Sequence, residues 1–135
     1  MKSNLRSIWC CSLAMGLLGS AGVTQALETM HQPASFRLVA ASELPREARE
    51  TLALIRKGGP YPYAKDGSIF SNRERILPKE PRGFYHEFTV KTPQARDRGA
   101  RRVICGGALV KQQPQVLDTC YYTDDHYASF KKIKE

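Results

Sequence analysis

The sequence predicts an α+β fold in which one N-terminal helix packs on a twisted antiparallel β-sheet. Three observations favour this class. A single segment has the apolar spacing of an amphipathic helix, and it precedes all the strand-like segments. Several short segments rich in aromatic and β-branched residues follow it, with turn residues between them. The 135 residues are enough for one domain, and no internal repeat or low-complexity tract divides them.

The helix is predicted over residues 44–57. Pro45 suits its first turn, and Gly58-Gly59 can supply a left-handed cap at its C-terminal end. The segment's apolar side chains fall on one stripe, which we expect to face the core: Leu44, Ala48, Leu52 and Ile55.

The first residues of the chain have the layout of a secretory signal peptide. Lys2 and Arg6 precede an apolar run from Ile8 to Val23, and Thr24-Gln25-Ala26 offers small residues at a cleavage site. The alternative is an uncleaved membrane anchor, for which the apolar run is short. The predicted organisation is a signal peptide, a flexible leader and a domain, over residues 1–26, 27–43 and 44–135.

Two of the four cysteines, Cys10 and Cys11, lie inside this signal. Cys105 and Cys120 remain, and in an exported protein such a pair most simply forms one disulfide. The chain has no CxxC motif and only three histidines, so it offers no credible ligand set for zinc. We therefore expect neither a metal nor another cofactor.

The chain is basic. Its formal net charge is +8, and this falls to +6 because Lys2 and Arg6 leave with the signal. A compact domain this basic attracts polyanions, nucleic acid foremost and anionic surfaces second. The alternative, that the charge serves solubility alone, is not excluded by charge itself.

A central strand is predicted over residues 84–90, and it ends where Lys91-Thr92-Pro93 prevents a continuing ladder. Strand alternation assigns one set of side chains to the core face: Phe84, His86, Phe88 and Val90. The opposite, open face receives the others: Tyr85, Glu87 and Thr89. We interpret His86 as a structural histidine because it falls on the core face.

The arginine-rich segment 96–105 is predicted to return as the neighbouring strand. It brings Arg102 towards the open face, and Arg98 lies close by in the connecting turn. A carboxylate such as Glu87 among arginines on an open sheet is either a structural ion-pair lattice or an anion-handling site. Both readings stay open on these residues alone.

A short strand is predicted at residues 68–70, and a polar segment, 71–74, follows it. Asn72 tolerates unusual backbone angles, so this segment could present successive backbone N–H groups to a ligand. Residues 76–78 are expected to return to the core.

The C-terminal part of the chain begins with a connection over residues 106–119, which contains Pro114 and little pattern. Strand character resumes at residues 120–122. We predict a last strand over residues 126–130 and a charged tail over 131–135.

Four residues form a candidate catalytic set: Glu87, Arg98, Arg102 and His126. They supply a carboxylate, two fixed cations and a side chain of the type that titrates near neutrality. That combination suits general acid–base chemistry on a phosphodiester. RNA carries its own nucleophile in the 2′-OH, so no nucleophilic serine or cysteine is required. Seen alone, His126 is more often a surface histidine than a catalyst.

The sequence resembles the secreted guanyl-specific microbial ribonucleases of bacteria, the barnase-like family. Separate motifs occur in the family's order from Leu44 to Phe130, and they are Leu44-Pro45 with Thr51-Leu52, residues 59–67, 70–74, 85–90, 96–106 and 121–130. The connection 106–119, with a cysteine on each side, departs from this pattern by being longer.

The resemblance implies the microbial ribonuclease fold and roles for the catalytic set. Glu87 would be the general base for the ribose 2′-OH, and His126 the general acid for the departing 5′-oxygen. Arg98 and Arg102 would hold the phosphoryl group as charge develops.

The resemblance also implies how substrate is bound. Residues 70–74 match the guanine-binding loop, made of Phe70, Ser71, Asn72, Arg73 and Glu74. The Glu74 carboxylate would accept from guanine N1–H and the exocyclic amine. Tyr127 matches a tyrosine near the phosphate, and Tyr85 shares the open face with Glu87. We expect both tyrosines to contact substrate.

The activity implied is a secreted, monomeric endoribonuclease that cleaves single-stranded RNA after guanosine without a metal. It would form a 2′,3′-cyclic phosphate and then a 3′-phosphate, and a barstar-like protein would be its inhibitor. A catalytically silent secreted polyanion- or RNA-binding protein is the alternative of a different class. The same nuclease used as an antibacterial toxin is a third reading, which differs only in biology.

Overall fold

The computed structural model describes residues 35–107 and 117–134. Their elements, in chain order, are β1 (Arg37–Ala40), a 3₁₀ helix (Ala41–Glu43), α1 (Arg46–Lys57), β2 (Ser68–Ile69), β3 (Tyr85–Thr89), β4 (Arg102–Gly106), β5 (Thr119–Thr123) and β6 (Lys131–Lys134). The predicted signal peptide lies outside the described residues. Within the described ranges, no helix is long and apolar enough to cross a membrane.

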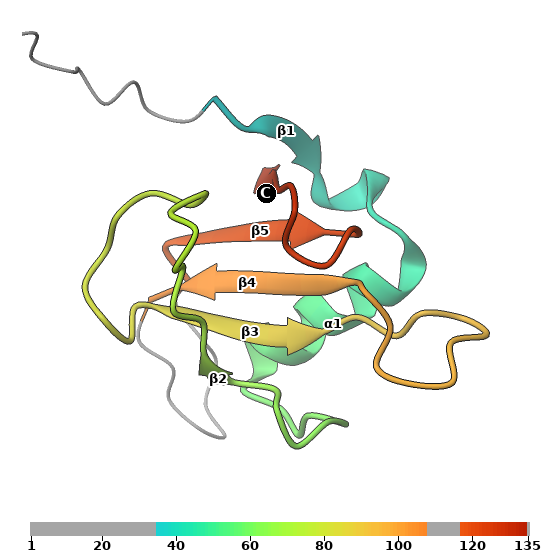
Figure 1. Cartoon of the computed structure of the whole chain (residues 1–135). Coiled ribbons are helices and arrows are strands. Elements are labelled where there is room, and N and C mark those ends of the chain that lie inside the picture. The colour runs from blue at the N-terminus through green and yellow to red at the C-terminus, as the bar shows by residue number, and fades with distance from the viewer. Residues whose placement is uncertain (1–34, 108–116, 135) are drawn as a thin grey trace, which may run out of the picture. The chain divides into compact units, whose positions relative to one another are not determined.

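The strands form one six-stranded sheet in the order β1-β6-β5-β4-β3-β2 (Figure 1). Strands β2 to β6 pair antiparallel, whereas β1 pairs parallel with β6. One helix packs on this sheet, so the predicted α+β class is confirmed. The prediction of a purely antiparallel sheet is wrong at the β1 edge, where the two ends of the domain run side by side.

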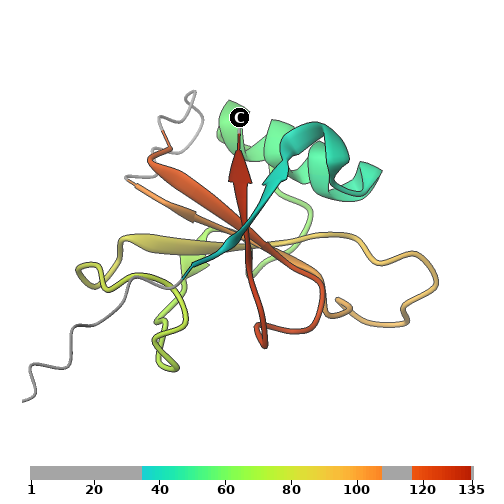
Figure 2. The ribbon, with the colours of Figure 1, turned by 90° about the horizontal axis from the view of Figure 1, so that it is seen from above.

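Helix α1 covers one face of the sheet (Figure 2). Its predicted apolar stripe is buried: Leu44, which precedes it, Ala48, Leu52 and Ile55 are each at most 4% exposed. Gly58 follows in the left-handed region at φ 80°, and its N–H donates to the carbonyls of Leu54 and Ile55. A residue without Cβ adopts this angle readily, so the predicted glycine cap ends the helix.

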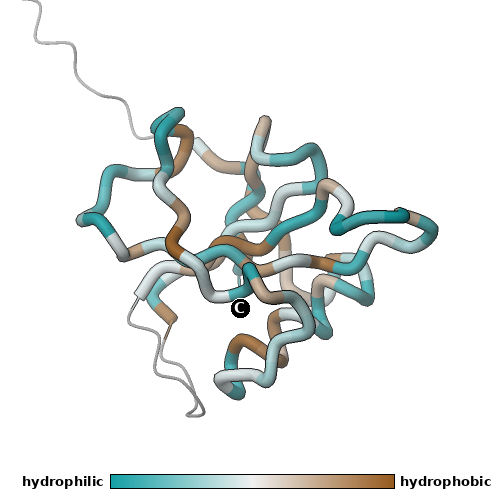
Figure 3. The backbone as a smooth tube through the Cα atoms, turned by 60° about the horizontal axis from the view of Figure 1, so that its bottom comes forward, coloured by the Kyte–Doolittle hydropathy of each residue, from teal (hydrophilic) through white to brown (hydrophobic). Residues whose placement is uncertain are grey.

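Apolar side chains form two buried clusters, one on each face of the sheet. Figure 3 shows the hydrophobic residues, in brown, interspersed with hydrophilic ones along the backbone. On the helix side, Phe88, Val90, Val103 and Tyr122 pack with the stripe of α1. The second cluster lies on the opposite face and contains Leu77, Tyr85, Ile104, Tyr121 and Phe130. The second cluster supports the loops that bear the candidate site.

The predicted alternation of core-facing and open-face side chains along residues 84–90 is confirmed except at Phe84. Phe84 was expected in the core with Phe88, but it packs against the second cluster. The ladder begins only at Tyr85, so strand alternation does not extend back to Phe84. His86 is half-buried, and its Nδ1 lies 3.1 Å from the Gly67 carbonyl oxygen, in keeping with a structural role.

The sheet also includes residues that the sequence assigned to a leader and a tail. Residues 37–43 form β1 and the 3₁₀ helix, so the prediction of a flexible leader is wrong for them. Residues 131–134 form β6 instead of a charged tail. Both strands are only four residues long, and β6 has three lysines. They pair with each other although they are distant in sequence, a contact that local patterning does not reveal.

The predicted strand over residues 126–130 is wrong. His126 and Tyr127 have φ angles of 57° and 72°, in the left-handed region, where a strand cannot continue. A turn therefore runs from Asp124 to Ala128, and two irregular residues connect it to β6.

The predicted Cys105–Cys120 disulfide is present, with the Cα atoms 4.2 Å apart. The two cysteines face each other in the β4–β5 register and are buried on the helix side. They tie the base of the connection 106–119, of which residues 108–116 lie outside the described ranges.

Candidate active site

Glu87 lies on the open face of the sheet, midway along β3. Its side chain is 15% exposed. The Tyr127 hydroxyl donates to its Oε2 at 2.8 Å, and its Oε1 lies 3.6 Å from Nη2 of Arg98. The carboxylate is therefore held between a hydrogen-bond donor and a cation, while its edge still reaches solvent.

Arg98 is held by a threonine on the same strand as Glu87. Its Nε and Nη2 donate to Oγ1 of Thr89 at 3.1 and 2.6 Å. Thr89 is 2% exposed, so the acceptor is fixed in the sheet. A guanidinium bound through two donors keeps one orientation, and its charge is directed towards the open face beside Glu87.

Arg102 is 4% exposed, and its Nη1 donates to the carbonyl oxygens of Gly99 and Arg101 at 2.8 and 2.7 Å. Its guanidinium carbon lies 5.8 Å from the centre of the Tyr127 ring. Among the residues that the structure describes, no carboxylate lies within ion-pair distance of Arg102, and its Nε has no partner. A buried cation without a carboxylate is costly, so this place is suited to an anionic ligand.

The turn after β5 presents His126 and Tyr127, both in left-handed conformations that cost energy for residues with a Cβ. Asp125 stabilises the turn: its carboxylate accepts from the Thr123 hydroxyl and from both the N–H and the hydroxyl of Ser129. The Tyr127 N–H donates to Thr123 Oγ1. The hydrogen bonds from Ser129, and then that from Thr123, lower the pKa of Asp125 to about 2.

His126 is exposed, and its N–H donates to the Ala100 carbonyl oxygen at 3.2 Å. This bond joins the turn to the loop that carries Arg98. The His126 ring centre is 5.0 Å from that of Tyr127, whose hydroxyl contacts Glu87. Burial, followed by the hydrogen bond and charge of Glu87, raises the pKa of Tyr127, so its phenol remains a donor.

The polar loop after β2 is built around Asn72, at φ 46°. The Asn72 side chain donates to the carbonyls of Leu77 and Pro78 and accepts from the Leu77 N–H. Within the described ranges, the backbone N–H groups of residues 71–74 donate to no protein acceptor. The asparagine thus holds a loop that keeps these donors available, as the sequence predicted.

A pocket of about 220 Å³ opens between this loop and the turn that bears Tyr127. The ring of Phe70 stacks on that of Tyr127, with centres 5.3 Å apart and planes inclined by 27°. The walls of the pocket come from the loop after β2, the turn after β5 and the second cluster. The lining residues are Phe70, Ser71, Asn72, Arg73, Glu74, Ile76, Tyr127 and Phe130. The exposed carboxylate of Glu74 and the free N–H groups give this aromatic pocket acceptors and donors.

One predicted contact residue lies elsewhere. Tyr85 does not line this pocket but a neighbouring hollow, and its hydroxyl donates to the Pro78 carbonyl. Its pKa is raised, first by burial and then by Tyr121 and Glu80. Arg101 points towards the helix side, where its Nη1 lies 3.9 Å from Glu47.

The sequence did not assign roles to three residues that shape the site: Thr89, Thr123 and Asp125. Thr89 orients Arg98, while Thr123 and Asp125 hold the turn of His126 and Tyr127. The run Thr123-Asp124-Asp125 is typical of turns that side chains stabilise, so the sequence does indicate the roles of Thr123 and Asp125. No local signal points to Thr89, because its partner is nine residues away in a loop.

The site therefore combines a half-buried carboxylate, two cations and an exposed imidazole beside an aromatic pocket with hydrogen-bonding walls. This arrangement can bind a planar polar group, hold an adjacent anion and transfer protons on either side of it. Over residues 35–107 and 117–134, no three His, Cys, Asp or Glu side chains are grouped to hold a metal ion.

A family model described as ribonuclease matches residues 28–134, and the chain belongs to the ribonuclease family. It is 50% identical over 96 residues to guanyl-specific ribonuclease St of Saccharopolyspora erythraea, covering 71% of this chain and 86% of that protein. It is also 50% identical over 97 residues to guanyl-specific ribonuclease Sa of Kitasatospora aureofaciens, with 72% and 93% covered.

Solved structures of ribonuclease Sa2 share the fold. One, with mononucleotides, superposes with a TM-score of 0.66 at 48% identity, covering 75% of this chain and 96% of that one. Another, with guanosine-2′-cyclophosphate, has a TM-score of 0.64 at 48% identity and covers 74% and 97%. A third contains 3′-GMP, at a TM-score of 0.62 and 47% identity, covering 73% and 97%.

Proposed function

We propose that this protein is an endoribonuclease that cleaves single-stranded RNA preferentially after guanosine. The observation that carries the proposal is the aromatic pocket bearing Glu74, placed directly beside Glu87, Arg98, Arg102 and His126. The relatives named guanyl-specific ribonucleases, at 50% identity, support the same activity.

Glu87 is the general base in this scheme. It takes the proton of the ribose 2′-OH, and the oxygen attacks the adjacent phosphorus to form a 2′,3′-cyclic phosphate. The Tyr127 hydroxyl and Arg98 hold the carboxylate in one orientation. Positioning of this kind allows the carboxylate to meet the hydroxyl without first reorganising.

His126 is the general acid, which protonates the 5′-oxygen as it leaves. Its exposure suits contact with the departing nucleotide. Arg98 and Arg102 stabilise the phosphoryl oxygens as negative charge develops. Water, deprotonated by His126, then attacks the cyclic phosphate, and Glu87 returns its proton to the departing 2′-oxygen, which leaves a 3′-phosphate. Ribonuclease Sa2 structures contain guanosine-2′-cyclophosphate and 3′-GMP, which match these two stages.

Guanine selectivity comes from the loop 70–74. The free backbone N–H groups can donate to the acceptors of the base, and Glu74 can accept from N1–H and the exocyclic amine. Phe70 offers the base a stacking surface. Adenine carries no hydrogen at N1 and lacks the amine at C2, so it would leave Glu74 without a partner.

Export, a monomeric state and a barstar-like inhibitor complete the proposal. The signal-like residues 1–26 and the disulfide favour an oxidising compartment outside the cytoplasm. An enzyme of this kind endangers the RNA of its own cell, and an acidic protein could cover the basic face. Intact-mass analysis of exported material tests the first part: it should lack Met1 and the apolar run.

The activity is tested with purified mature protein and a defined oligoribonucleotide in the presence of a chelator. Mapping the fragment ends should show 2′,3′-cyclic phosphates that convert to 3′-phosphates, mainly on guanosine. A protein that binds the RNA but leaves it intact at every pH would instead support a non-catalytic binding protein.

A further inference from the structure

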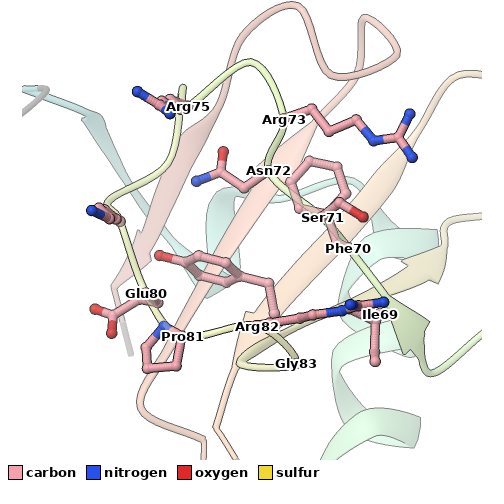
Figure 4. A pocket seen from close by; sticks show the side chains of 12 residues that line it. Ile69, Phe70, Ser71, Asn72, Arg73, Arg75, Glu80, Pro81, Arg82 and Gly83 are labelled. Carbon is pink, nitrogen blue, oxygen red and sulfur yellow. The ribbon is translucent and has the colours of Figure 1, made fainter.

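A second hollow, of about 450 Å³, adjoins the aromatic pocket, and residues 70–73 line both. Figure 4 shows Arg73, Arg75 and Arg82 spaced around it, with the Phe70 ring on its inner side. Lys79 also lines it, and Glu80 is the one carboxylate among its lining residues. Nothing in the scheme above uses this hollow.

The cations around this hollow are free. Arg73, Arg75, Lys79 and Arg82 are all exposed, and over the described residues none of them forms an ion pair. Four cations against one carboxylate leave a surplus of positive charge that polyanions relieve. The hollow is therefore suited to phosphate.

The walls between these cations are apolar. Ile69 is 52% exposed although it is a large aliphatic residue, and Pro81, another lining residue, is also exposed. The buried ring of Tyr85 also contributes, with its hydroxyl bonded to the Pro78 carbonyl. An apolar floor within a basic rim fits a nucleotide, whose base packs on the floor and whose phosphate contacts the rim.

The position of the hollow sets the direction of the RNA. Tyr85, at the start of β3, lines the hollow, whereas Thr89, at the end of β3, holds Arg98. Glu87 lies between them. The phosphate on the 3′ side of guanosine goes to the Arg98 end, so the nucleotide on the 5′ side leaves towards the hollow. This step rests on the proposed function.

We propose that the hollow is an upstream subsite, which binds the nucleotide and phosphate on the 5′ side of the cleaved guanosine. Arg75, Lys79 and Arg82 supply its charge. Substrates extended upstream should thus be cleaved with a higher kcat/KM than substrates that begin at guanosine. Extension downstream should gain nothing from these three residues.

The test compares three RNAs with one guanosine each: GpU, UpUpGpU and GpUpUpU. The subsite variant is Arg75→Gln/Lys79→Gln/Arg82→Gln, which keeps an unbranched polar side chain at each position and removes three charges. The control variant, Arg37→Gln/Lys132→Gln/Lys134→Gln, removes three exposed charges at the β1–β6 edge, opposite β2 in the sheet. We measure kcat/KM for each of the three RNAs with each of the three proteins. The comparison separates the effect of charge at the hollow from the effect of overall charge.

In the parent and in the control variant, UpUpGpU should be cleaved about tenfold faster than GpU, because three weak surface contacts together are worth about a factor of ten. In the subsite variant this ratio should fall to about one to two, with GpU changed less than about twofold. The ratio of kcat/KM for GpUpUpU to kcat/KM for GpU should be the same in all three proteins.

An unchanged upstream ratio in the subsite variant would overturn the subsite, as would an equal loss in both variants or a loss confined to GpUpUpU. A parent that cleaves GpU but gains nothing from upstream extension would also overturn it while leaving the proposed function intact. A parent that cleaves none of the three RNAs would overturn the proposed function first, and the subsite with it.

Discussion

Glu87 and His126 carry out the two proposed proton transfers, and Tyr127 contacts both of them. The carboxylate is half-buried on a rigid strand, whereas the imidazole is exposed on a turn. This difference fits their proposed roles, because the base meets a bound ribose and the acid meets a group that departs into solvent.

Glu87→Gln and His126→Gln should each lower kcat by about 10² to 10⁴-fold, since each removes one proton-transfer group. Glu87→Gln also preserves the shape of the side chain. Both variants should still bind RNA, because Arg98 and Arg102 remain. The measurement is cleavage rate alongside binding of an oligonucleotide with 2′-deoxyguanosine at the cleavage site. Glu50→Gln, at an exposed carboxylate on α1, is the matched control. Parent-like cleavage by Glu87→Gln would contradict the mechanism.

Glu74→Ala should reduce selectivity more than rate. Losing a bidentate acceptor costs about 1–3 kcal/mol of base discrimination, so the preference for guanosine over adenosine should fall about 5- to 150-fold. Comparing kcat/KM for GpU and ApU in parent and variant measures this. If both substrates slow equally, the carboxylate supports the loop instead of reading the base.

At the scale of elements, the turn between β5 and β6 depends on Asp125. Its carboxylate accepts three hydrogen bonds, from Thr123 and Ser129, and so offsets the strained backbone of His126 and Tyr127. The charged form is the better acceptor, which is why its pKa is depressed.

Asp125 should make stability depend on pH in the acid range. Because its pKa falls from 3.8 to about 2 on folding, its contribution is complete above pH 3.8 and lost as pH falls towards 2. Urea unfolding between pH 2 and pH 5 should show a shallower pH dependence for Asp125→Asn than for the parent. Asp118→Asn, at another exposed carboxylate, is the control, and identical curves for parent and Asp125→Asn would refute the role.

The disulfide stabilises the β4–β5 pair on the side of the sheet away from the site. Cys105 and Cys120 are 15 residues apart, and closing such a loop is worth roughly 3 kcal/mol in the chain-entropy model. Cys105→Ala/Cys120→Ala should lose about this much unfolding free energy, measured in urea. The folded fraction should keep the parent kcat, because Arg102 lies at the other end of β4. If the fully folded variant had a much lower kcat than the parent, the disulfide would also be needed for the geometry of the site.

At the scale of the whole molecule, positive charge serves substrate binding. The loop after β2 and the turn between β5 and β6 extend from the face of the sheet opposite α1 (Figure 2). Arg98, in the connection from β3 to β4, lies beside Glu87 on this same face. RNA binding should therefore weaken strongly with salt.

The logarithm of the binding constant should fall linearly with the logarithm of NaCl concentration, by about 0.7 for each phosphate contacted. A slope of about −2 to −3 is expected for a tetranucleotide with a 2′-deoxyguanosine, which binds without being cleaved. The subsite variant should have a smaller slope than the β1–β6 control variant. Salt-independent binding would show that base contacts dominate.

The features that depend on local chemistry were predictable from the amino-acid sequence. Apolar spacing determined α1 and its buried stripe, and alternation along β3 placed Glu87 and Thr89 on the open face. Asn72 marked the loop that keeps its backbone donors free. These features depend on neighbours within a few residues, so they are visible without a structure.

Tertiary structure alone decided the rest. The parallel pairing of β1 with β6 joins segments about ninety residues apart, and the Tyr127–Glu87 bond spans 40. The left-handed turn at His126 persists because Asp125 and Ala100 hold it in place. In each case a long-range contact outweighs a local preference, since a short charged strand or a strained turn is stable only when the rest of the fold supplies its partners.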